Sequence, residues 1–293
     1  MSKFIAEISS NHSTDFDRCI DFIDSAAKIG CYAVKFQLFE INQLFCNEVL
    51  ELSKDHRRRK KWELPKEFIP ELSNYSKKQN LKFSCTPFFL DAVDFLEPYV
   101  DFFKIASYEL LWNDLIRKCA STKKPLIIST GMADMDEIDN AVSVSRNSGC
   151  KDLSILQCVS HYPASYEDVN LRVIKTFRDR YKCKVGWSDH TVNENVIRRA
   201  KEKWNADYIE FHLDLDGNGE EYSTGHCWLP EKINHLITEK NFLDENSEYD
   251  LVIDGDGIKM PCKSEKKERN WRADPEDGLR PLKNIRNKVE NYL

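Results

Sequence analysis

The sequence predicts an α/β protein with the (β/α)8 fold, a TIM barrel, and three observations support this prediction. Short runs of β-branched and apolar residues alternate with longer segments of helical period, as expected for βα units on a parallel sheet. Eight such pairs fall within about 240 residues, which suits a barrel better than a doubly wound sheet. The phosphate-loop sequences GxGxxG and GxxxxGKS/T, typical of the competing fold, are absent.

The expected strands and helices follow one another along the chain. The strands are expected at residues 4–8, 33–37, 81–85, 102–105, 126–129, 153–158, 185–187 and 208–213. The helices are expected at residues 15–29, 65–79, 90–97, 112–121, 135–148, 169–180, 193–204 and 230–240. In the first helix, Ile20, Ile23 and Ala27 lie on one face, and Pro65 suits the first turn of the second. We therefore assign residues 1–245 to the barrel and residues 246–293 to a C-terminal extension packed on it.

Composition excludes several classes of protein. The 293 residues are 41% hydrophobic and carry a net charge of −6, which argues against wholesale disorder and against general nucleic-acid binding. No apolar run approaches the roughly 18 residues of a membrane span, and the first residues do not resemble a signal peptide. The ten cysteines are scattered without a CxxC pair, as expected for reduced thiols. We expect a cytoplasmic protein with small-molecule partners.

One connection interrupts the alternation of strands and helices. Residues 38–64 form a long link that contains the basic run His-Arg-Arg-Arg-Lys-Lys at residues 56–61. This run has two interpretations. It holds a phosphorylated or acidic ligand over the barrel mouth, or it is a solvated face, which is the more common meaning of a charge run.

Polar residues follow the predicted strands, at the end where TIM barrels carry their chemistry. They are Glu7, Lys35, Gln37, Thr86, Lys104, Ser107, Ser129, Ser160, Tyr162, Ser188, His190 and His212. The two lysines can neutralise a phosphate or carboxylate, and the hydroxyl groups can donate hydrogen bonds to anionic oxygens. His190 and His212 follow adjacent strands, so their imidazoles can share one divalent ion, although either can also be a hydrogen-bonded core histidine.

These residues lie in segments that resemble the sialic acid synthase family, the NeuB-type nonulosonic acid synthases. The segments are AEISSNH from residue 6, AVKFQ from 33, SCTPF from 84, FKIAS from 103, STGM from 129, YP at 162, GWSDHT from 186 and EFH from 210. They occur in the family's order at similar spacing, over roughly residues 4–240. A single short segment of this kind would be weak support, but eight in register are strong support.

The resemblance implies a transferase that condenses phosphoenolpyruvate with water and an N-acylated amino-aldose, such as N-acetylmannosamine. The products would be phosphate and a nonulosonic acid of the sialic type, destined for a surface polysaccharide. The resemblance also implies a divalent metal, Mn²⁺ or Mg²⁺, bound by His190 and His212. Phosphoenolpyruvate would be held by Lys35, Thr86, Lys104, Ser107, Ser129 and Ser188. Glu7 would position or deprotonate the attacking water, while Glu109, Gln37 and Tyr162 would contact the sugar.

The sequence departs from the family pattern in three places. The C-terminal antifreeze-like domain, which supplies an arginine to a partner's site, is not found here, so we hypothesise that Arg272 or Arg280 replaces it; a tail that only packs on the barrel is equally compatible. Ser160 stands where the family usually has asparagine. After the eighth strand, Glu220 or Glu221 would replace a sugar-binding aspartate, and His226 would touch the substrate.

These departures leave the acceptor sugar open. Two other functions remain alternatives: a phosphoenolpyruvate-dependent aldol synthase with a different aldose, and a non-catalytic sugar-binding barrel. The oligomeric state is also open, a homodimer being common for barrels of this kind.

Overall fold

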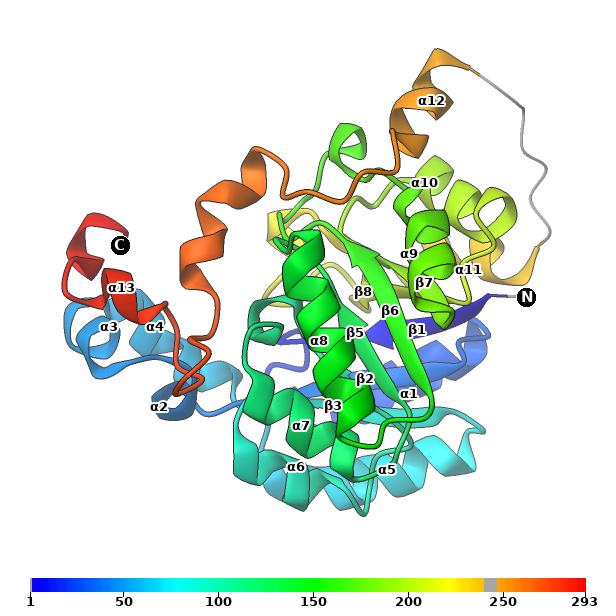
Figure 1. Cartoon of the computed structure of the whole chain (residues 1–293). Helices are drawn as coiled ribbons and strands as arrows, with labels where there is room; N and C mark the ends of the chain where they lie inside the picture. The colour runs from blue at the N-terminus through cyan, green and yellow to red at the C-terminus, as the bar shows by residue number, and fades with distance from the viewer. Residues whose placement is uncertain (1, 240–246) are drawn as a thin grey trace.

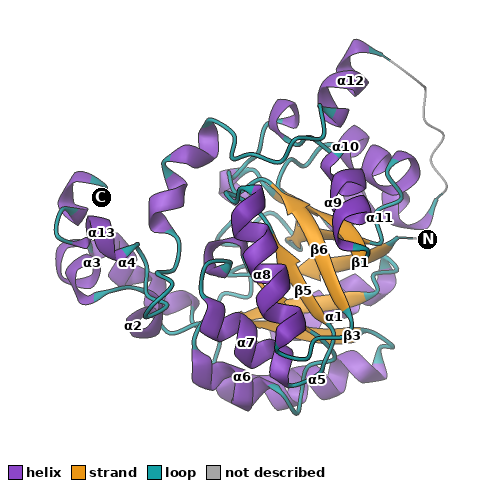
Figure 2. Ribbon diagram, in the orientation of Figure 1, coloured by secondary structure: helices purple, strands orange, loops and turns teal. Residues whose placement is uncertain are grey.

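The computed structural model describes residues 2–239 and 247–293, and it has eight parallel strands arranged as a nearly closed barrel with helices outside (Figures 1 and 2). The strands are β1 (Lys3–Glu7), β2 (Ala33–Leu38), β3 (Lys82–Pro87), β4 (Phe103–Ile105), β5 (Leu126–Ser129), β6 (Leu153–Cys158), β7 (Lys184–Asp189) and β8 (Tyr208–Leu213). Their order is β3-β2-β1-β8-β7-β6-β5-β4. β3 and β4, the two ends of this order, are not paired as strands, but the Ser84 hydroxyl on β3 donates to the carbonyl of Phe102, just before β4, at 2.8 Å. The predicted barrel is confirmed.

Helices follow the strands as predicted. They are α1 (Phe16–Lys28), α5 (Ile69–Lys78), α6 (Leu90–Leu96), α7 (Asn113–Ser121), α8 (Met135–Asn147), α9 (Val173–Tyr181), α10 (Glu194–Arg198) and α11 (Pro230–Thr238). Sequence explains several starts: Asp15 caps α1, and Asp134 forms a capping box with Glu137 at the start of α8. The expected end of the last helix at Lys240, and the expected domain boundary at residues 245 and 246, lie outside the described residues.

The long connection after β2 is more ordered than the sequence indicated. It folds into α2 (Ile41–Leu44), α3 (Asn47–Leu52), α4 (Lys54–Arg58) and a 3-10 turn at Arg59–Trp62. These helices lie beside α13 (Lys283–Arg286) near the C-terminus (Figure 1). The Cys46 N–H donates to the Arg280 carbonyl at 2.9 Å, and the Arg280 N–H donates to the Leu44 carbonyl at 2.8 Å. We call residues 41–62 and 268–293 the side lobe.

The C-terminal extension is fastened to the barrel by buried polar contacts. After β9 (Cys227–Trp228), which pairs with β8, and α11, the chain forms α12 (Glu248–Asp254). Asp254 at the end of α12 binds the buried guanidinium of Arg199 with an Oδ2–Nη2 distance of 2.6 Å. Further along, the buried carboxylate of Glu265 accepts hydrogen bonds from the N–H groups of Met132 and Ser160, each at 2.7 Å. The extension thereby ties together the loops that follow β5 and β6.

Replacing Glu265 with alanine is expected to lower the free energy of unfolding by about 3 kcal/mol. Its carboxylate satisfies buried amides, and hydrogen bonds to charged groups are worth about 1.5–3 kcal/mol each, part of which relaxation recovers. Urea unfolding of the full chain measures the change. Glu265→Gln keeps the acceptor oxygen and should cost less. Equal stability of Glu265→Ala and the unmodified protein would show that the extension is held elsewhere.

The barrel interior has an apolar end and a polar end. The apolar layer near the N-terminal ends of the strands is built from Ile5, Ala33, Phe102, Ile127, Leu156 and Tyr208. The C-terminal ends of the same strands carry buried charged groups such as Glu7, Lys35 and Lys104. Because burying charges is costly unless they are paired, their concentration at one end marks the functional end of the barrel. None of the described helices is long and apolar enough to cross a bilayer.

Candidate active site

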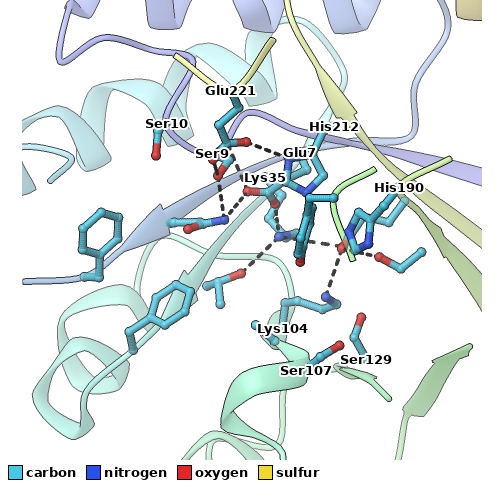
Figure 3. Close-up of a pocket in the computed structure, with 18 of the residues that line it drawn as sticks. Glu7, Ser9, Ser10, Lys35, Lys104, Ser107, Ser129, His190, His212 and Glu221 are labelled. Atoms are coloured by element: carbon cyan, nitrogen blue, oxygen red, sulfur yellow. Dashed lines mark hydrogen bonds and ion pairs between the residues drawn. The ribbon is translucent and has the colours of Figure 1, made fainter. Parts of the chain in front are cut away.

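A pocket opens at the polar end of the barrel, between the strand ends and the side lobe (Figure 3). Most of the residues selected from the sequence line it: Glu7, Lys35, Gln37, Thr86, Lys104, Ser107, Ser129, Tyr162, Ser188, His190, His212, Glu221 and Arg280. They come from all around the barrel and from both ends of the chain. The parallel strands, in register at their carboxyl ends, bring them together: Glu7 on β1 lies opposite both Lys35 on β2 and His212 on β8.

Two buried lysines form the floor of the pocket. The Lys104 Nζ donates to Glu210 Oε1 at 3.0 Å, and the Lys35 Nζ donates to Thr86 Oγ1 at 3.2 Å. Lys35 also contacts the Glu7 carboxylate and lies 3.8 Å from Glu210 Oε2. Burial raises the pKa of Glu210, but Lys104 and Lys35 outweigh it and hold that pKa at about 2. Burial lowers the pKa of Lys35 to about 8. The floor therefore holds two ammonium groups with carboxylate counterions.

Hydroxyl groups surround the lysines. The Ser188 hydroxyl donates to Glu210 Oε1 at 3.2 Å, and the Ser107 hydroxyl accepts from the Gly131 N–H at 2.9 Å. The buried Ser129 hydroxyl has no hydrogen-bond partner among the described residues. A buried hydroxyl without a partner costs free energy, so Ser129 is suited to bind an oxygen of a ligand. Lysines and hydroxyls together can hold a small polyanion.

Beside the lysines lies a cluster of imidazoles and one carboxylate, which we call the histidine cluster: His190, His212, His226 and Glu221. His212 Nδ1 is 3.0 Å and His226 Nε2 is 3.4 Å from Glu221 Oε2. The rings of His190 and His212 have their centres 5.3 Å apart. The sequence prediction named His190 and His212 for the metal. The structure brings these two rings together and adds Glu221 and His226 from the segment after β8.

The chemistry of this cluster fits a divalent metal ion. Ligand atoms of His212, Glu221 and His226, with the Cys227 thiol, all lie within 4.8 Å of one another. Burial lowers the pKa of His212 to about 4, so its imidazole is neutral at pH 7 and offers a lone pair. His190 donates its Nδ1–H to the Val159 carbonyl at 2.7 Å, which fixes the orientation of its ring. Burial opposes its protonation, but the neighbouring Cys158 outweighs burial and raises the pKa of His190, so a metal ion would have to displace a proton from Nε2. Imidazole and carboxylate ligands suit several first-row metals.

Glu7 lies between the lysine floor and the histidine cluster (Figure 3). Its Oε1 accepts hydrogen bonds from the Gln37 side-chain amide at 2.9 Å and from the Ser9 N–H at 3.0 Å. The Ser9 hydroxyl in turn donates to Glu221 Oε1 at 2.5 Å. This network fixes the orientation of the Glu7 carboxylate at the position where the two halves of the site meet.

Four residues named from the sequence do not line the pocket, and one of them, Glu220, pairs with Lys61 at 2.8 Å instead. Glu109 is buried behind its wall and accepts from Arg280, whose Nε lies 2.9 Å from Glu109 Oε1. Arg272 is turned away and binds Glu137 on α8 at 2.9 Å. Ser160 is buried, and its N–H donates to Glu265. Of the two arginines named from the C-terminal extension, Arg280 lines the pocket, whereas Arg272 does not.

Sequence reasoning missed Glu210, and it included Arg59 only as one member of the basic run at residues 56–61. Glu210 precedes His212 by two residues on β8, and the period of two along a strand places both side chains on the inner face. This alternation along the strand could have identified Glu210 as a site residue from the sequence. Arg59 also lines the pocket, but nothing in the basic run distinguishes it from its neighbours before the fold is known.

Comparisons with known proteins agree with this geometry. A model of the NeuB family matches residues 22–246. The chain belongs to the NeuB family. It is similar to an uncharacterized protein of Methanocaldococcus jannaschii (37% identity over 89% of this chain and 74% of the relative) and to N,N'-diacetyllegionaminic acid synthase of Campylobacter jejuni (33% identity; 91% and 81%).

A solved structure extends the comparison. The N-acetylneuraminic acid synthetase of Leptospira borgpetersenii, crystallised with citrate, superposes with a TM-score of 0.73 at 28% identity, covering 91% of this chain and 90% of that one. The relatives from Campylobacter jejuni and Leptospira borgpetersenii are synthases, so this member of the NeuB family is a transferase-type enzyme of a family that makes nonulosonic acids.

Proposed function

We propose that this enzyme condenses phosphoenolpyruvate with an N-acylated amino-aldose and water, releasing phosphate and a nonulosonic acid. The observation that carries the proposal is the meeting of a lysine floor and a histidine cluster in one pocket, with Glu7 between them. The lysine floor suits a small polyanion, and the histidine cluster suits a metal ion. The reaction forms a bond between C3 of phosphoenolpyruvate and the aldehyde carbon, adds water at C2, and breaks the C2–O bond to phosphate.

The lysine floor would hold phosphoenolpyruvate. Lys35 and Lys104 supply two cations, while Thr86, Ser107, Ser129 and Ser188 supply hydroxyl donors around them. The carboxylate of Glu210, held ionised by both lysines, keeps the two ammonium groups in place before the substrate arrives. Fixed donors of this kind stabilise charge without reorganising during the reaction.

The other half of the pocket would activate and orient the aldose. His212, His226 and Glu221, whose ligand atoms lie close together, would hold the divalent metal with the neighbouring His190, and the metal supplies Lewis-acid polarisation of a carbonyl oxygen when bound. The Glu7 carboxylate is oriented by Gln37 and Ser9 to accept a proton from the attacking water. The outer wall, made of Phe39, Leu44, Trp62 and Phe88, is apolar and suits the methyl groups of N-acyl substituents.

The proposal is tested by measuring phosphate release from phosphoenolpyruvate in the presence of Mn²⁺ or Mg²⁺ and each of a panel of N-acylated amino-aldoses, with and without chelator. We expect phosphate release that requires both an aldose and a metal, and the best aldose would identify the product. Phosphate release without any aldose would point to a hydrolase. Tight binding of aldoses with no turnover, in the presence of metal and phosphoenolpyruvate, would favour the sugar-binding alternative.

A further inference from the structure

Two members of the histidine cluster, Glu221 and His226, lie on the loop of residues 214–226, which connects β8 to β9. Within this loop the only regular element is the short 3-10 turn Tyr222–Thr224. The hydrogen bonds of a strand therefore do not position these two side chains, as they position His212 on β8. Their place in the cluster depends on the contacts that hold the loop.

Asn11, in the turn that follows β1, makes three of these contacts. Its side chain is fully buried, and its Oδ1 accepts a hydrogen bond from the Glu221 N–H at 2.8 Å. Its Nδ2 donates to the Leu213 carbonyl at 3.0 Å and to Cys227 Sγ at 3.5 Å. An N–H can only donate and a carbonyl can only accept, so these partners determine which way the amide group points. One side chain thus joins both ends of the loop to Glu221.

The loop packs against Asn11 without room for another side chain. A Cβ added at Gly219 would lie 2.5 Å from Asn11 Oδ1 and 2.2 Å from Asp214 Oδ1, so this close approach requires glycine. A second attachment lies beside it. The Arg18 Nη2 binds the buried Asp214 carboxylate at 3.0 Å, and the Arg18 Nε donates to the Asn11 carbonyl at 2.8 Å. The start of the loop is therefore fastened to the turn after β1 as well.

The contact with Asn11 fixes the backbone from which the Glu221 side chain reaches the cluster. Glu221 Oε1 accepts from the Ser9 hydroxyl, and its Oε2 lies 3.0 Å from His212 Nδ1 (Figure 3). The same Oε2 lies 3.4 Å from His226 Nε2. Ligand groups that the fold already holds together lose less conformational entropy when an ion binds them. Asn11 itself does not line the pocket, so any effect it has on the site acts through Glu221.

We propose that Asn11 is a positioning residue of the histidine cluster. It holds the 214–226 loop so that Glu221 and His226 stand beside His212 in the arrangement that binds a divalent metal ion. The inference rests on the proposed function, because it takes the histidine cluster as the metal site. Partners that orient metal ligands typically contribute about tenfold to a hundredfold to metal affinity.

The test is calorimetric titration of the full chain with Mn²⁺ alone. In Asn11→Ala, the Kd for Mn²⁺ should rise about tenfold to a hundredfold. Asn170→Ala is the matched control, because the Asn170 side chain also holds a loop, accepting from the Gly257 N–H at 2.9 Å and donating to the Ile258 carbonyl at 3.1 Å. Both variants should unfold at lower urea concentration, but only Asn11→Ala should lose Mn²⁺ affinity. A folded Asn11→Ala protein with unchanged affinity would overturn the inference.

A second variant tests the same contact with the Asn11 side chain intact, and it decides the matter if Asn11→Ala does not fold. Gly219→Ala places a Cβ against Asn11 Oδ1, so the loop must shift and the Kd for Mn²⁺ should rise in the same way. Gly149→Ala is its control. Gly149 has a φ of +99°, so alanine strains the backbone there, but the position has open space around it and should leave Mn²⁺ binding unchanged. Unchanged Mn²⁺ affinity in Gly219→Ala would contradict the inference.

These titrations need no turnover, which separates this inference from the proposed function. Weakened Mn²⁺ binding in Asn11→Ala and Gly219→Ala, with no reaction of any aldose, would keep the inference and reject the synthase. Metal-dependent turnover of an aldose, with unchanged Mn²⁺ affinity in both variants, would keep the synthase and reject the inference. If the unmodified protein bound no Mn²⁺, the inference would be rejected together with the metal site.

Discussion

Replacing Lys104 with methionine is expected to lower kcat/KM for phosphoenolpyruvate by about a hundredfold to a thousandfold. The substitution removes one of the two ammonium groups of the floor and keeps most of the side-chain volume. It also leaves Glu210, buried and ionised, without its partner at 3.0 Å. The substrate would then meet a negative charge that only the more distant Lys35 balances, where it now meets a cation. Steady-state kinetics with phosphoenolpyruvate as the varied substrate measure the loss.

A double variant separates the catalytic effect from the structural one. Breaking a buried ion pair typically costs about 3–5 kcal/mol of stability, so Lys104→Met alone should also unfold at lower urea concentration. Adding Glu210→Gln removes the orphaned charge and should restore most of the stability while leaving activity low. Lys118→Met, at a more exposed lysine that pairs with Asp94, should change neither. Recovery of activity in the double variant would show that Lys104 serves only to neutralise Glu210.

The sequence predicts those site residues that lie on the strands or directly after them. A parallel barrel places the ends of all its strands around one opening, so residues far apart in sequence, such as Glu7 and His212, meet there once the strands are recognised. The same rule does not extend to Glu109, which does not line the pocket. It lies in the 3-10 turn Ser107–Glu109 after β4, where the period of two no longer applies, and its side chain is drawn behind the wall by Arg280.

The features that the sequence did not predict, the side lobe and the arginines that line the pocket, depend on contacts between segments that are distant in sequence. The side lobe forms because apolar residues such as Phe45 and Val49 pack against Val289 near the other end of the chain. No local sequence pattern predicts this packing between the two ends of the chain. The fold of the side lobe determines which arginines line the pocket. It places Arg59, and not its basic neighbours, at the pocket, and it places Arg280 there while Arg272 binds Glu137.

Replacing His212 with alanine is expected to weaken metal binding by about a hundredfold or more and to abolish metal-dependent turnover. His212 is central to the histidine cluster: its Nδ1 lies 3.0 Å from Glu221, and its ring neighbours those of His190 and His226. Removal of a direct ligand costs more than the tenfold to hundredfold typical of a supporting residue. Metal content of the purified protein, and calorimetric titration with Mn²⁺, measure the change independently of activity.

The same measurement decides how many protein groups hold the metal. If His226 is a ligand, His226→Ala should weaken Mn²⁺ binding as much as His212→Ala does. If His226 only orients Glu221, from which its Nε2 is 3.4 Å away, the loss should stay near tenfold. His235→Ala is the control, because His235 binds Glu194 at the surface, away from the pocket. Unchanged Mn²⁺ affinity in His212→Ala would place the metal elsewhere, and the proximity of His212, Glu221 and His226 would then reflect hydrogen bonding alone.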